Sequence, residues 1–169
     1  MARKRGLVTL PTLYTIGYEG ASIEDLLATL KAAAIARLID IRESPYSRRP
    51  EFSSEELAAA LADHGIAYEH IRELGNPPAG REAARAGHMA AYREIFTAHL
   101  KGADGRKGLA RALAVAANQR VCLLCFEKSA AHCQRSMVVS RIEAMAARQV
   151  VHLRVAAGQA HPAQTAFEF

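Results

Sequence analysis

Residues 124–136 contain the densest group of side chains able to do chemistry. The pattern predicts a buried strand that ends near Cys125, a short loop, and a helix that starts near Cys133. Backbone N–H groups at a helix N-terminus attract anions, and a guanidinium group can donate two parallel hydrogen bonds to a phosphate. With Arg135 and Ser136 beside that helix start, the segment predicts an anion-binding site.

Glu127 follows directly after the predicted strand end. A carboxylate that faces an anion site can act as a general base or hold a ribose-like hydroxyl. The alternative is an ion pair between Glu127 and Arg135 that only orders the loop. We favour the catalytic interpretation because several polar residue types converge on one predicted pocket.

The cysteines allow several uses. Cys125 is a candidate catalytic residue, and Cys133 would have its thiolate stabilised at a helix N-terminus. A phosphatase-like Cys-x5-Arg spacing is absent, because Cys133 stands only two residues before Arg135. Buried strand cysteines such as Cys122 are more often small core residues. Adjacent His132 and Cys133 seldom ligate one ion, so no metal site is predicted.

A second group surrounds the end of the next predicted strand. Asp40 would be buried at a strand end, which is costly unless the carboxylate is paired or used. Arg42, Arg48 and Arg49 follow on a proline-containing loop and suit phosphate or a nucleic-acid backbone. Alternatively, Asp40 pairs with Arg42 or Arg135 and merely orders the loops.

The remaining predicted pocket residues lie beside these two groups. The run from Gly17 to Gly20 follows the first strand but is not GxGxxG, so it predicts no dinucleotide site. The cofactor is left unassigned. The pocket is expected to include Gly17, Tyr18, Glu19, Pro45, Ser47, Glu73, Gly75, His132 and Cys133.

Strands and helices are expected to alternate along the chain. Ser22 is a predicted helix cap with Asp25 three residues on, and Ser53 is another with Glu56 at the third position. Residues 73–87 are rich in glycine and proline and are predicted to form a loop or lid. The predicted strands are Leu13–Gly17, Ala36–Ile41, Ala67–Ile71, Arg120–Phe126 and Val150–Leu153, and the later helices are His88–Leu100, Gly108–Asn118 and Cys133–Arg148.

This alternation predicts an α/β fold. Parallel strands joined by right-handed crossovers give a single three-layer α/β/α domain with a mostly parallel, Rossmann-like sheet of about five strands. We expect one domain over residues 1–169, with peripheral tails at 1–11 and 155–169. Ligands of such folds gather at the carboxyl ends of the strands. Both chemical groups follow strand ends and are therefore expected at one edge of the sheet.

Composition narrows the functional classes. Of the 169 residues, 50% are hydrophobic and 23% are charged, as is ordinary for a globular protein. No apolar run approaches the roughly 18 residues that span a bilayer, and the basic start does not resemble a signal peptide. Three cysteines within one short stretch indicate reduced thiols, so a cytoplasmic location without membrane contact is expected. The formal charge of +5 suits phosphate-bearing partners as well as plain solubility.

The order of these motifs resembles a family of bacterial and archaeal proteins known as "domain of unknown function 488". The similarity spans about residues 13–153. The chain departs from the common pattern at Tyr18 and Gln134, where members more often carry histidine. The matching stretches are residues 15–18, 38–42, 45–52, 68–75 and 123–136. The resemblance implies the fold and the motif positions and leaves the reaction open.

Three functional hypotheses follow. The first is an enzyme that acts on a nucleotide or another phosphate-bearing small molecule, by hydrolysis or group transfer. In it Arg42 and Arg135 hold the anion, Glu127 is the acid or base, and Asp40 orients an arginine. The second is a nucleic-acid-binding protein that uses the Arg42–Arg49 loop with Arg81 and Arg85, although aromatics are only 6% of residues. The third is a regulatory domain that senses an anion or oxidation through Cys125 and Cys133. The oligomeric state is not predicted.

Overall fold

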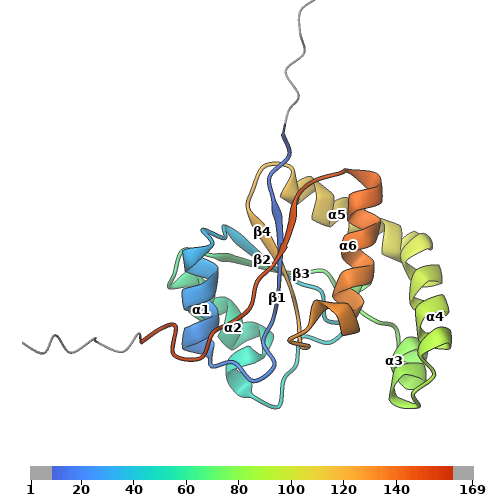
Figure 1. Ribbon diagram of the computed structural model, residues 1–169, viewed down its shortest axis with the longest axis horizontal. Helices are drawn as coiled ribbons and strands as arrows, with labels where there is room; N and C mark the ends of the chain where they lie inside the picture. The colour runs from blue at the N-terminus through green and yellow to red at the C-terminus, as the bar shows by residue number, and fades with distance from the viewer. Residues whose placement is uncertain (1–8, 162–169) are drawn as a thin grey trace, which may run out of the picture.

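The computed structural model describes residues 9–161 and has a five-stranded, fully parallel sheet at its centre (Figure 1). The strand order is β3-β2-β4-β1-β5. This confirms the predicted α/β fold with a Rossmann-like layout. The strands are β1 (Leu13–Gly17), β2 (Arg37–Asp40), β3 (Ala67–His70), β4 (Val121–Cys125) and β5 (Val150–His152).

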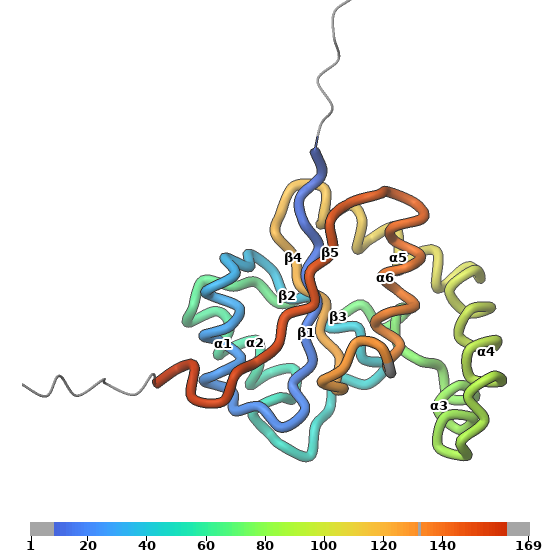
Figure 2. The backbone as a smooth tube through the Cα atoms, viewed as in Figure 1, coloured from blue at the N-terminus to red at the C-terminus, as the bar shows by residue number. Residues whose placement is uncertain are grey.

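Helices cover both faces of the sheet, so the domain has three layers (Figures 1 and 2). The helices α1 and α2 lie on one face, whereas α4, α5 and α6 lie on the other and α3 packs against α4. Three 3-10 turns complete the connections, at Pro50–Phe52, Arg72–Leu74 and Ala130–His132. The helices are α1 (Ile23–Ala32), α2 (Ser54–Ala62), α3 (Pro78–Arg85), α4 (Met89–Lys101), α5 (Ala103–Ala116) and α6 (Gln134–Met145).

The central strand β4 shows why the core has two halves. All five of its residues are buried, as expected for a strand with helices on both faces. Because side chains alternate along a strand, Cys122 and Leu124 pack with α1 and α2, whereas Leu123 and Cys125 join the core of the opposite layer. Two cysteines three residues apart therefore point into different layers.

The two predicted helix caps differ in the structure. The Ser22 hydroxyl accepts the N–H of Asp25 at 3.1 Å, so the first cap is confirmed. Ser53 stands at the cap position of α2 but makes no capping bond with its side chain. Its hydroxyl instead accepts the Ser47 N–H at 3.0 Å and lies 3.3 Å from the Ser47 carbonyl. The expected capping box is therefore replaced by a bond that fixes the loop after β2.

The prediction of a loop or lid over residues 73–87 is wrong for its second half, which forms α3. Pro78 occupies the first helical position, where a missing N–H costs nothing. Gly80 leaves room for the Asn76 side chain, since a Cβ there would lie 2.1 Å from its Oδ1. Both residues that suggested a loop have a structural role in the start of this helix.

The segment after β5 returns to α1. The Asp25 carboxylate accepts the N–H groups of Gly158 at 2.9 Å and Ala160 at 2.8 Å. These hydrogen bonds from Ala160 and Gly158 lower the pKa of Asp25. Of the peripheral tails expected at residues 1–11 and 155–169, residues 1–8 and 162–169 lie outside the described part of the chain.

The connections define where the sheet opens. The chain leaves β1 and β2 toward α1 and α2, but it leaves β4, which lies between them, toward α6 on the other face. Loops that diverge from neighbouring strands leave a crevice at their carboxyl ends. Among the described residues, no helix has the combination of length and apolar character that crossing a membrane requires.

Candidate functional site

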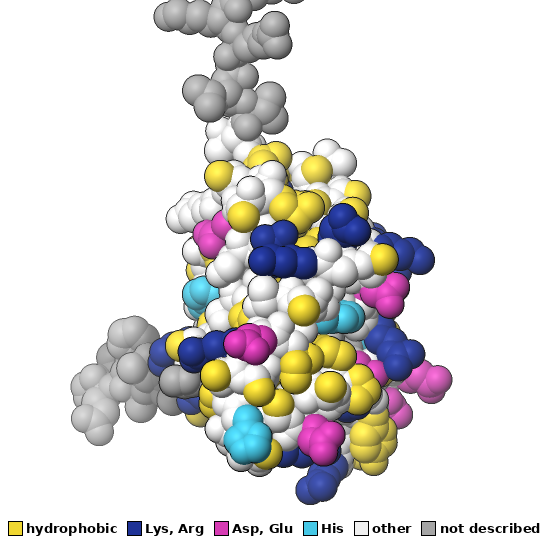
Figure 3. Space-filling view, turned by 90° about the vertical axis from the view of Figure 1, so that its right-hand side faces the viewer, with side chains coloured by type: hydrophobic (Ala, Val, Ile, Leu, Met, Phe, Trp, Pro, Cys, Tyr) yellow, Lys and Arg dark blue, Asp and Glu magenta, His cyan; other side chains and the backbone are white. Residues whose placement is uncertain are grey.

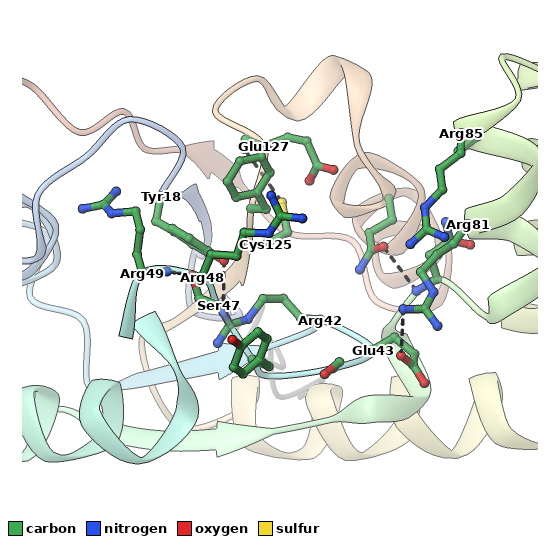
Figure 4. A pocket seen from close by; sticks show the side chains of 16 residues that line it. Tyr18, Arg42, Glu43, Ser47, Arg48, Arg49, Arg81, Arg85, Cys125 and Glu127 are labelled. Atoms are coloured by element: carbon green, nitrogen blue, oxygen red, sulfur yellow. Dashed lines mark hydrogen bonds and ion pairs between the residues drawn. The ribbon is translucent and has the colours of Figure 1, made fainter. Parts of the chain in front are cut away.

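A cavity of about 720 Å³ opens at the crevice over β2 and β4. Its walls come from the loops after β1, β2 and β4 and from α3, which faces them across the opening (Figure 4). Five arginines and two glutamates contribute to the lining. The full lining is Tyr18, Arg42, Glu43, Ser44, Tyr46, Ser47, Arg48, Arg49, Asn76, Arg81, Ala84, Arg85, Cys125, Phe126, Glu127 and Gln134.

The base of the cavity beside β2 is a buried ion pair. Asp40 is fully buried, and its carboxylate accepts Nε of Arg42 at 2.8 Å and Nη2 at 2.5 Å. The Arg42 backbone N–H and the Tyr68 hydroxyl also donate to this carboxylate, at 3.1 and 2.7 Å. Asp40 thus has four donors and does not line the cavity.

The hydrogen-bond donors of the Arg42 guanidinium are also used within the protein. Its Nη1 donates to the Tyr18 hydroxyl at 3.1 Å and to the Phe52 carbonyl at 2.9 Å. Burial alone would lower the pKa of Arg42, but the hydrogen bonds and charge of Asp40 outweigh it and the pKa is raised. Arg42 therefore stays charged and fixes the loop, with little donor capacity left for a ligand.

The other four cavity arginines differ in what they contact. Arg49 pairs with Glu51 at 3.0 Å and lies over the Phe52 ring at 4.4 Å, and Arg81 pairs with Glu43 at 3.3 Å. Arg48 and Arg85 make no ion pair with any residue between 9 and 161. Figure 4 shows Arg48 reaching over the centre of the cavity and Arg85 approaching from α3.

Glu127 and an aromatic pair form the wall beside β4. The Tyr18 ring meets Phe126 edge-on at 5.4 Å and stacks on Phe52 at 4.5 Å. Glu127 follows Phe126 and lies in Figure 4 above Cys125, on the side of the cavity opposite Arg42. A carboxylate thus stands within a cavity whose other walls are rich in arginine.

The turns after β1 and β4 hold each other tightly, and this fixes the backbone of Glu127. A Cβ at Gly17 would lie 1.7 Å from the Glu127 carbonyl oxygen, so the contact requires glycine. The Glu19 N–H donates to the Phe126 carbonyl at 2.9 Å, and the Glu19 carboxylate accepts the Lys128 N–H at 2.9 Å. Gly17 and Glu19 therefore hold the Glu127 segment in place without lining the cavity themselves.

Gln134 joins three loops at the start of α6. Its side-chain Nε2 donates to the Ile41 carbonyl at 2.8 Å, and its Oε1 accepts the Asn76 N–H at 3.2 Å. One side chain therefore connects the end of β2, the start of α6 and the segment before α3. This connection sets the distance between the two arginine-bearing walls.

Behind the cavity lie two thiols and a buried arginine. The Sγ atoms of Cys125 and Cys133 are 3.0 Å apart, and Cys133 Sγ accepts the Arg135 N–H at 3.1 Å. The Arg135 side chain is 1% exposed, and its Nε and Nη1 have no hydrogen-bond partner among the described residues. Arg135 does not line the cavity and cannot contact a ligand there directly.

Comparison with known families places the chain in one of them. Residues 22–142, well over half of the chain, match the family model described as "Domain of unknown function DUF488". The chain belongs to the DUF488 family. No curated protein and no solved structure matches the chain significantly. The resemblance noted from the motifs is thereby confirmed.

Two residues from the motif resemblance can now be placed. Tyr18 and Gln134, the positions at which that resemblance led us to expect histidine, both line the cavity. Tyr18 accepts a hydrogen bond from Arg42, and Gln134 bridges Ile41 and Asn76. In this member of the DUF488 family both positions hold the cavity together through uncharged groups.

The structure brings together seven of the seventeen residues expected at the site. Asp40, Arg135 and Cys133 lie beneath the cavity, while Ser136 donates to the Cys133 carbonyl at 3.0 Å within its own helix. Pro45, Glu73 and Gly75 line other, smaller hollows, and the side chain of His132 is outside the described part. Those that line the cavity are Tyr18, Arg42, Ser47, Arg48, Arg49, Cys125 and Glu127.

Several lining residues were not among the predicted site residues. Phe126, Asn76 and Gln134 carry no charge, and nothing in their type indicated a site. Glu43 follows Arg42 directly and was available from the sequence. Arg81 and Arg85 were associated only with nucleic acid, because α3 was expected to be a loop. Their spacing of four residues places both on one helical face, which would have indicated a shared target.

Proposed function

We propose that this protein is an enzyme that acts on a nucleotide or a related phosphorylated small molecule. The observation that carries the proposal is the placement of Arg48 and Arg85. Both line one cavity, both lack an ion-pair partner among the described residues, and Glu127 lines the same cavity. The volume of about 720 Å³ falls within the range of small-molecule and cofactor sites.

Phosphate binding is assigned to these two arginines. A guanidinium group presents a planar set of donors that matches phosphate oxygens. Arg81 and Arg49 are held by Glu43 and Glu51 and so add positive charge at a fixed distance. An anion entering this cavity gains a charged partner from two walls without breaking an internal ion pair.

A nucleobase or a sugar is assigned to the aromatic side. The Tyr46 side chain is 73% exposed and Phe126 is 49% exposed, although both are large and apolar. Exposed rings at a cavity are suited to stacking, which every base tolerates because each has a π-face. This favours a nucleotide over inorganic phosphate as the ligand.

Glu127 is assigned the proton transfer. In an enzyme of this type a carboxylate accepts a proton from water or a substrate hydroxyl while arginines stabilise the developing charge. Cys125 lies below it and lines the cavity through the end of β4. Asp40 is assigned a positioning role, since its acceptor capacity is filled by Arg42 and Tyr68.

Ligand binding is tested by a thermal-shift panel of inorganic phosphate, nucleosides and nucleotides. Calorimetry on the compound with the largest shift follows. A ligand that binds only the folded state raises its stability by mass action. We expect Arg48→Ala and Arg85→Ala each to weaken binding by roughly tenfold or more, since each removes a hydrogen bond to a charged group. Arg120→Ala is the control, because Arg120 precedes β4 at the opposite edge of the sheet.

Catalysis is tested with Glu127→Gln. The amide keeps the shape of the side chain and cannot accept the proton, so we expect ligand binding to persist while turnover of the identified nucleotide is lost. Turnover unchanged in this variant would reject the role of Glu127. If no phosphate-bearing compound of the panel raises the melting temperature, the proposed function itself is rejected.

A further inference from the structure

We propose that Cys125 and Cys133 form an oxidisable dithiol pair, which a hydroperoxide converts to an intramolecular disulfide. The inference rests on the two thiols and their surroundings and is independent of the proposed function. It identifies a modification site behind the cavity. The argument has three parts, namely the proximity of the sulfurs, the environment of Cys133, and access from the cavity.

The two sulfurs are already in contact. Cys125 is the last residue of β4 and Cys133 is the cap of α6, eight residues further on, and their Sγ atoms are 3.0 Å apart. Both thiols are free in the structure, with exposures of 1% and 5%. The packing that holds them is that of two regular elements, so the pair is maintained by the fold and not by a chance loop conformation.

Cys133 is the more acidic thiol. The hydrogen bond from Cys125 is the main influence that lowers the pKa of Cys133, and the N–H and the charge of Arg135 act in the same direction. For Cys125 the same hydrogen bond and burial raise the pKa, so Cys125 holds the proton. The buried Arg135 guanidinium, which has no acidic partner within residues 9–161, is the counter-charge of this thiolate.

Access for a small oxidant comes through the cavity. Cys125 lines the cavity, and the Sγ of Cys133, a residue that keeps 5% of its surface exposed, lies 3.0 Å from the Sγ of Cys125. Cys122 offers an internal comparison, because it is fully buried in the layer formed by α1 and α2. Burial raises the pKa of Cys122, so its thiol stays protonated and away from the oxidant.

The reaction balances with a hydroperoxide as oxidant. The Cys133 thiolate attacks the distal oxygen of the hydroperoxide, the O–O bond breaks, and the released alkoxide or hydroxide takes up a proton to leave as alcohol or water. Cys133 is then a sulfenic acid. The Cys125 sulfur attacks it and forms the S–S bond, and water leaves with the Cys125 proton. In total, two thiols lose two hydrogens and the peroxide is reduced.

A metal ion is the competing use of the same cluster, since Cys125, Cys133 and Glu127 have ligand atoms within 4.8 Å of one another. Two thiolates bound to one tetrahedral zinc ion at about 2.3 Å each stand roughly 3.8 Å apart. The observed separation of 3.0 Å is shorter than that. The buried positive charge of Arg135 beside the sulfurs also disfavours a cation. These two observations favour the thiol pair over a metal ion.

The experiment uses the full chain, reduced and freed of reductant, treated with hydrogen peroxide and then alkylated under denaturing conditions. We expect the intact mass to fall by two hydrogen atoms with one thiol left to alkylate. Peptide mapping is expected to place the free thiol at Cys122 and to join the other two. The disulfide should open again with dithiothreitol, with the fold retained by circular dichroism.

Three single variants give the controls. Cys122→Ser should form the disulfide as fast as the unmodified protein. Cys125→Ser should instead stop at the sulfenic acid of Cys133, which dimedone converts to a stable thioether as the sulfenic oxygen leaves in water. Cys133→Ser should lose both products. If Cys133→Ser fails to fold, the trapping result in Cys125→Ser still identifies the reactive sulfur.

Several outcomes would overturn the proposal. Peroxide treatment that leaves three alkylatable thiols would show that the pair is inert. A disulfide that joins two chains, seen on non-reducing gels, would place the chemistry elsewhere. Stoichiometric zinc in the purified protein, with loss of thiol reactivity that a chelator restores, would assign the cluster to a metal. Loss of peroxide reactivity would leave ligand binding by Arg48 and Arg85 untouched, so the two proposals fail separately.

Discussion

Asp40 and Arg42 illustrate how little a residue's type says about its use. Both had the character of active-site groups, yet the structure joins them as a buried unit that also engages Tyr18, Tyr68 and the Phe52 carbonyl. The pKa of Tyr68 is raised, mainly by burial and then by the charge of Asp40, so its hydroxyl remains a donor. This unit sets the position of the loop that carries Arg48.

Removing the charge of Asp40 tests this role. Asp40→Asn leaves the buried Arg42 guanidinium without its counter-ion. Removing one member of a buried ion pair lowers the stability of a protein by about 3–5 kcal/mol. We expect the free energy of unfolding to fall by that amount, measured by urea denaturation followed by circular dichroism.

Glu51→Gln is the matched control for Asp40→Asn. The ion pair of Glu51 with Arg49 is exposed, at 39% and 41% for the two side chains. Exposed pairs contribute about 0.2–1 kcal/mol. Equal losses in the two variants would show that Asp40 and Arg42 are not a structural unit.

The sequence at residue scale allowed the Asp40–Arg42 pair as one of two alternatives. Asp40 ends β2 and Arg42 follows two residues later, and in an extended chain side chains two residues apart lie on the same side, which makes their pairing geometrically simple. The sequence could not show that the Tyr18 hydroxyl accepts a hydrogen bond from Arg42 or that the Tyr68 hydroxyl donates one to Asp40, because both tyrosines belong to other parts of the sheet. Only the tertiary structure reveals that the acceptor capacity of Asp40 is used up.

At the scale of elements, the two serines that precede α1 and α2 have different structural roles. Ser22 caps its helix, whereas Ser53 directs its hydroxyl to Ser47 and so restrains the loop of Arg48 and Arg49. Ordering a loop before binding lowers the entropy lost when a ligand is bound. The helix α2 therefore serves the cavity through the residue that precedes it.

Paired substitutions separate these roles. Ser22→Ala removes a helix cap and should lower the free energy of unfolding by about 1 kcal/mol without changing ligand affinity. Ser53→Ala should weaken nucleotide binding and speed hydrogen exchange of the Ser47 amide, because that amide loses its acceptor. Calorimetry and exchange monitored by NMR provide the measurements. Identical effects of the two variants on binding would contradict the assignment.

Most elements were predicted to within two or three residues, because β-strands with continuous apolar runs and helices with periodic ones leave clear patterns. The start of α5 was predicted wrongly, since this helix begins at Ala103 and not at Gly108. The missed helix α3 shows how position and packing can change the meaning of proline and glycine in a sequence. Pro78 and Gly80 suggested a loop, yet proline suits the first turn of a helix and Gly80 makes room for Asn76. Since α3 carries Arg81 and Arg85, missing it hid one wall of the cavity.

At the scale of the molecule, positive charge is not spread evenly. On the face shown in Figure 3, Lys and Arg side chains are interspersed with Asp and Glu, and hydrophobic side chains gather toward the lower half. The cavity, in contrast, has five arginines against two glutamates. The concentration of arginines in the cavity is in line with the small anion proposed as its ligand, and the described residues on the face in Figure 3 form no continuous basic surface.

Salt dependence distinguishes a small anion from a nucleic acid as the partner. Binding of a nucleic acid releases many counterions, so its affinity falls by about 10³–10⁵ between 50 and 200 mM salt when six to ten phosphates are contacted. We expect a mononucleotide to lose far less over that range and single-stranded DNA or RNA to bind weakly. Fluorescence anisotropy with labelled oligonucleotides and calorimetry with nucleotides make the comparison. Tight oligonucleotide binding with a steep salt slope would favour the Arg42–Arg49 loop as a nucleic-acid surface.

The position of β4 between β1 and β2 has a consequence for synthesis on the ribosome. The strands β1 and β2 emerge early but cannot pair with each other, so each keeps an unpaired edge until a segment near the end of the chain arrives. Such edges are prone to pair with other chains. The cavity is also completed late, when Gln134 bridges Ile41 and Asn76. A nascent chain that stalls before β4 therefore exposes apolar strands and has no assembled ligand site.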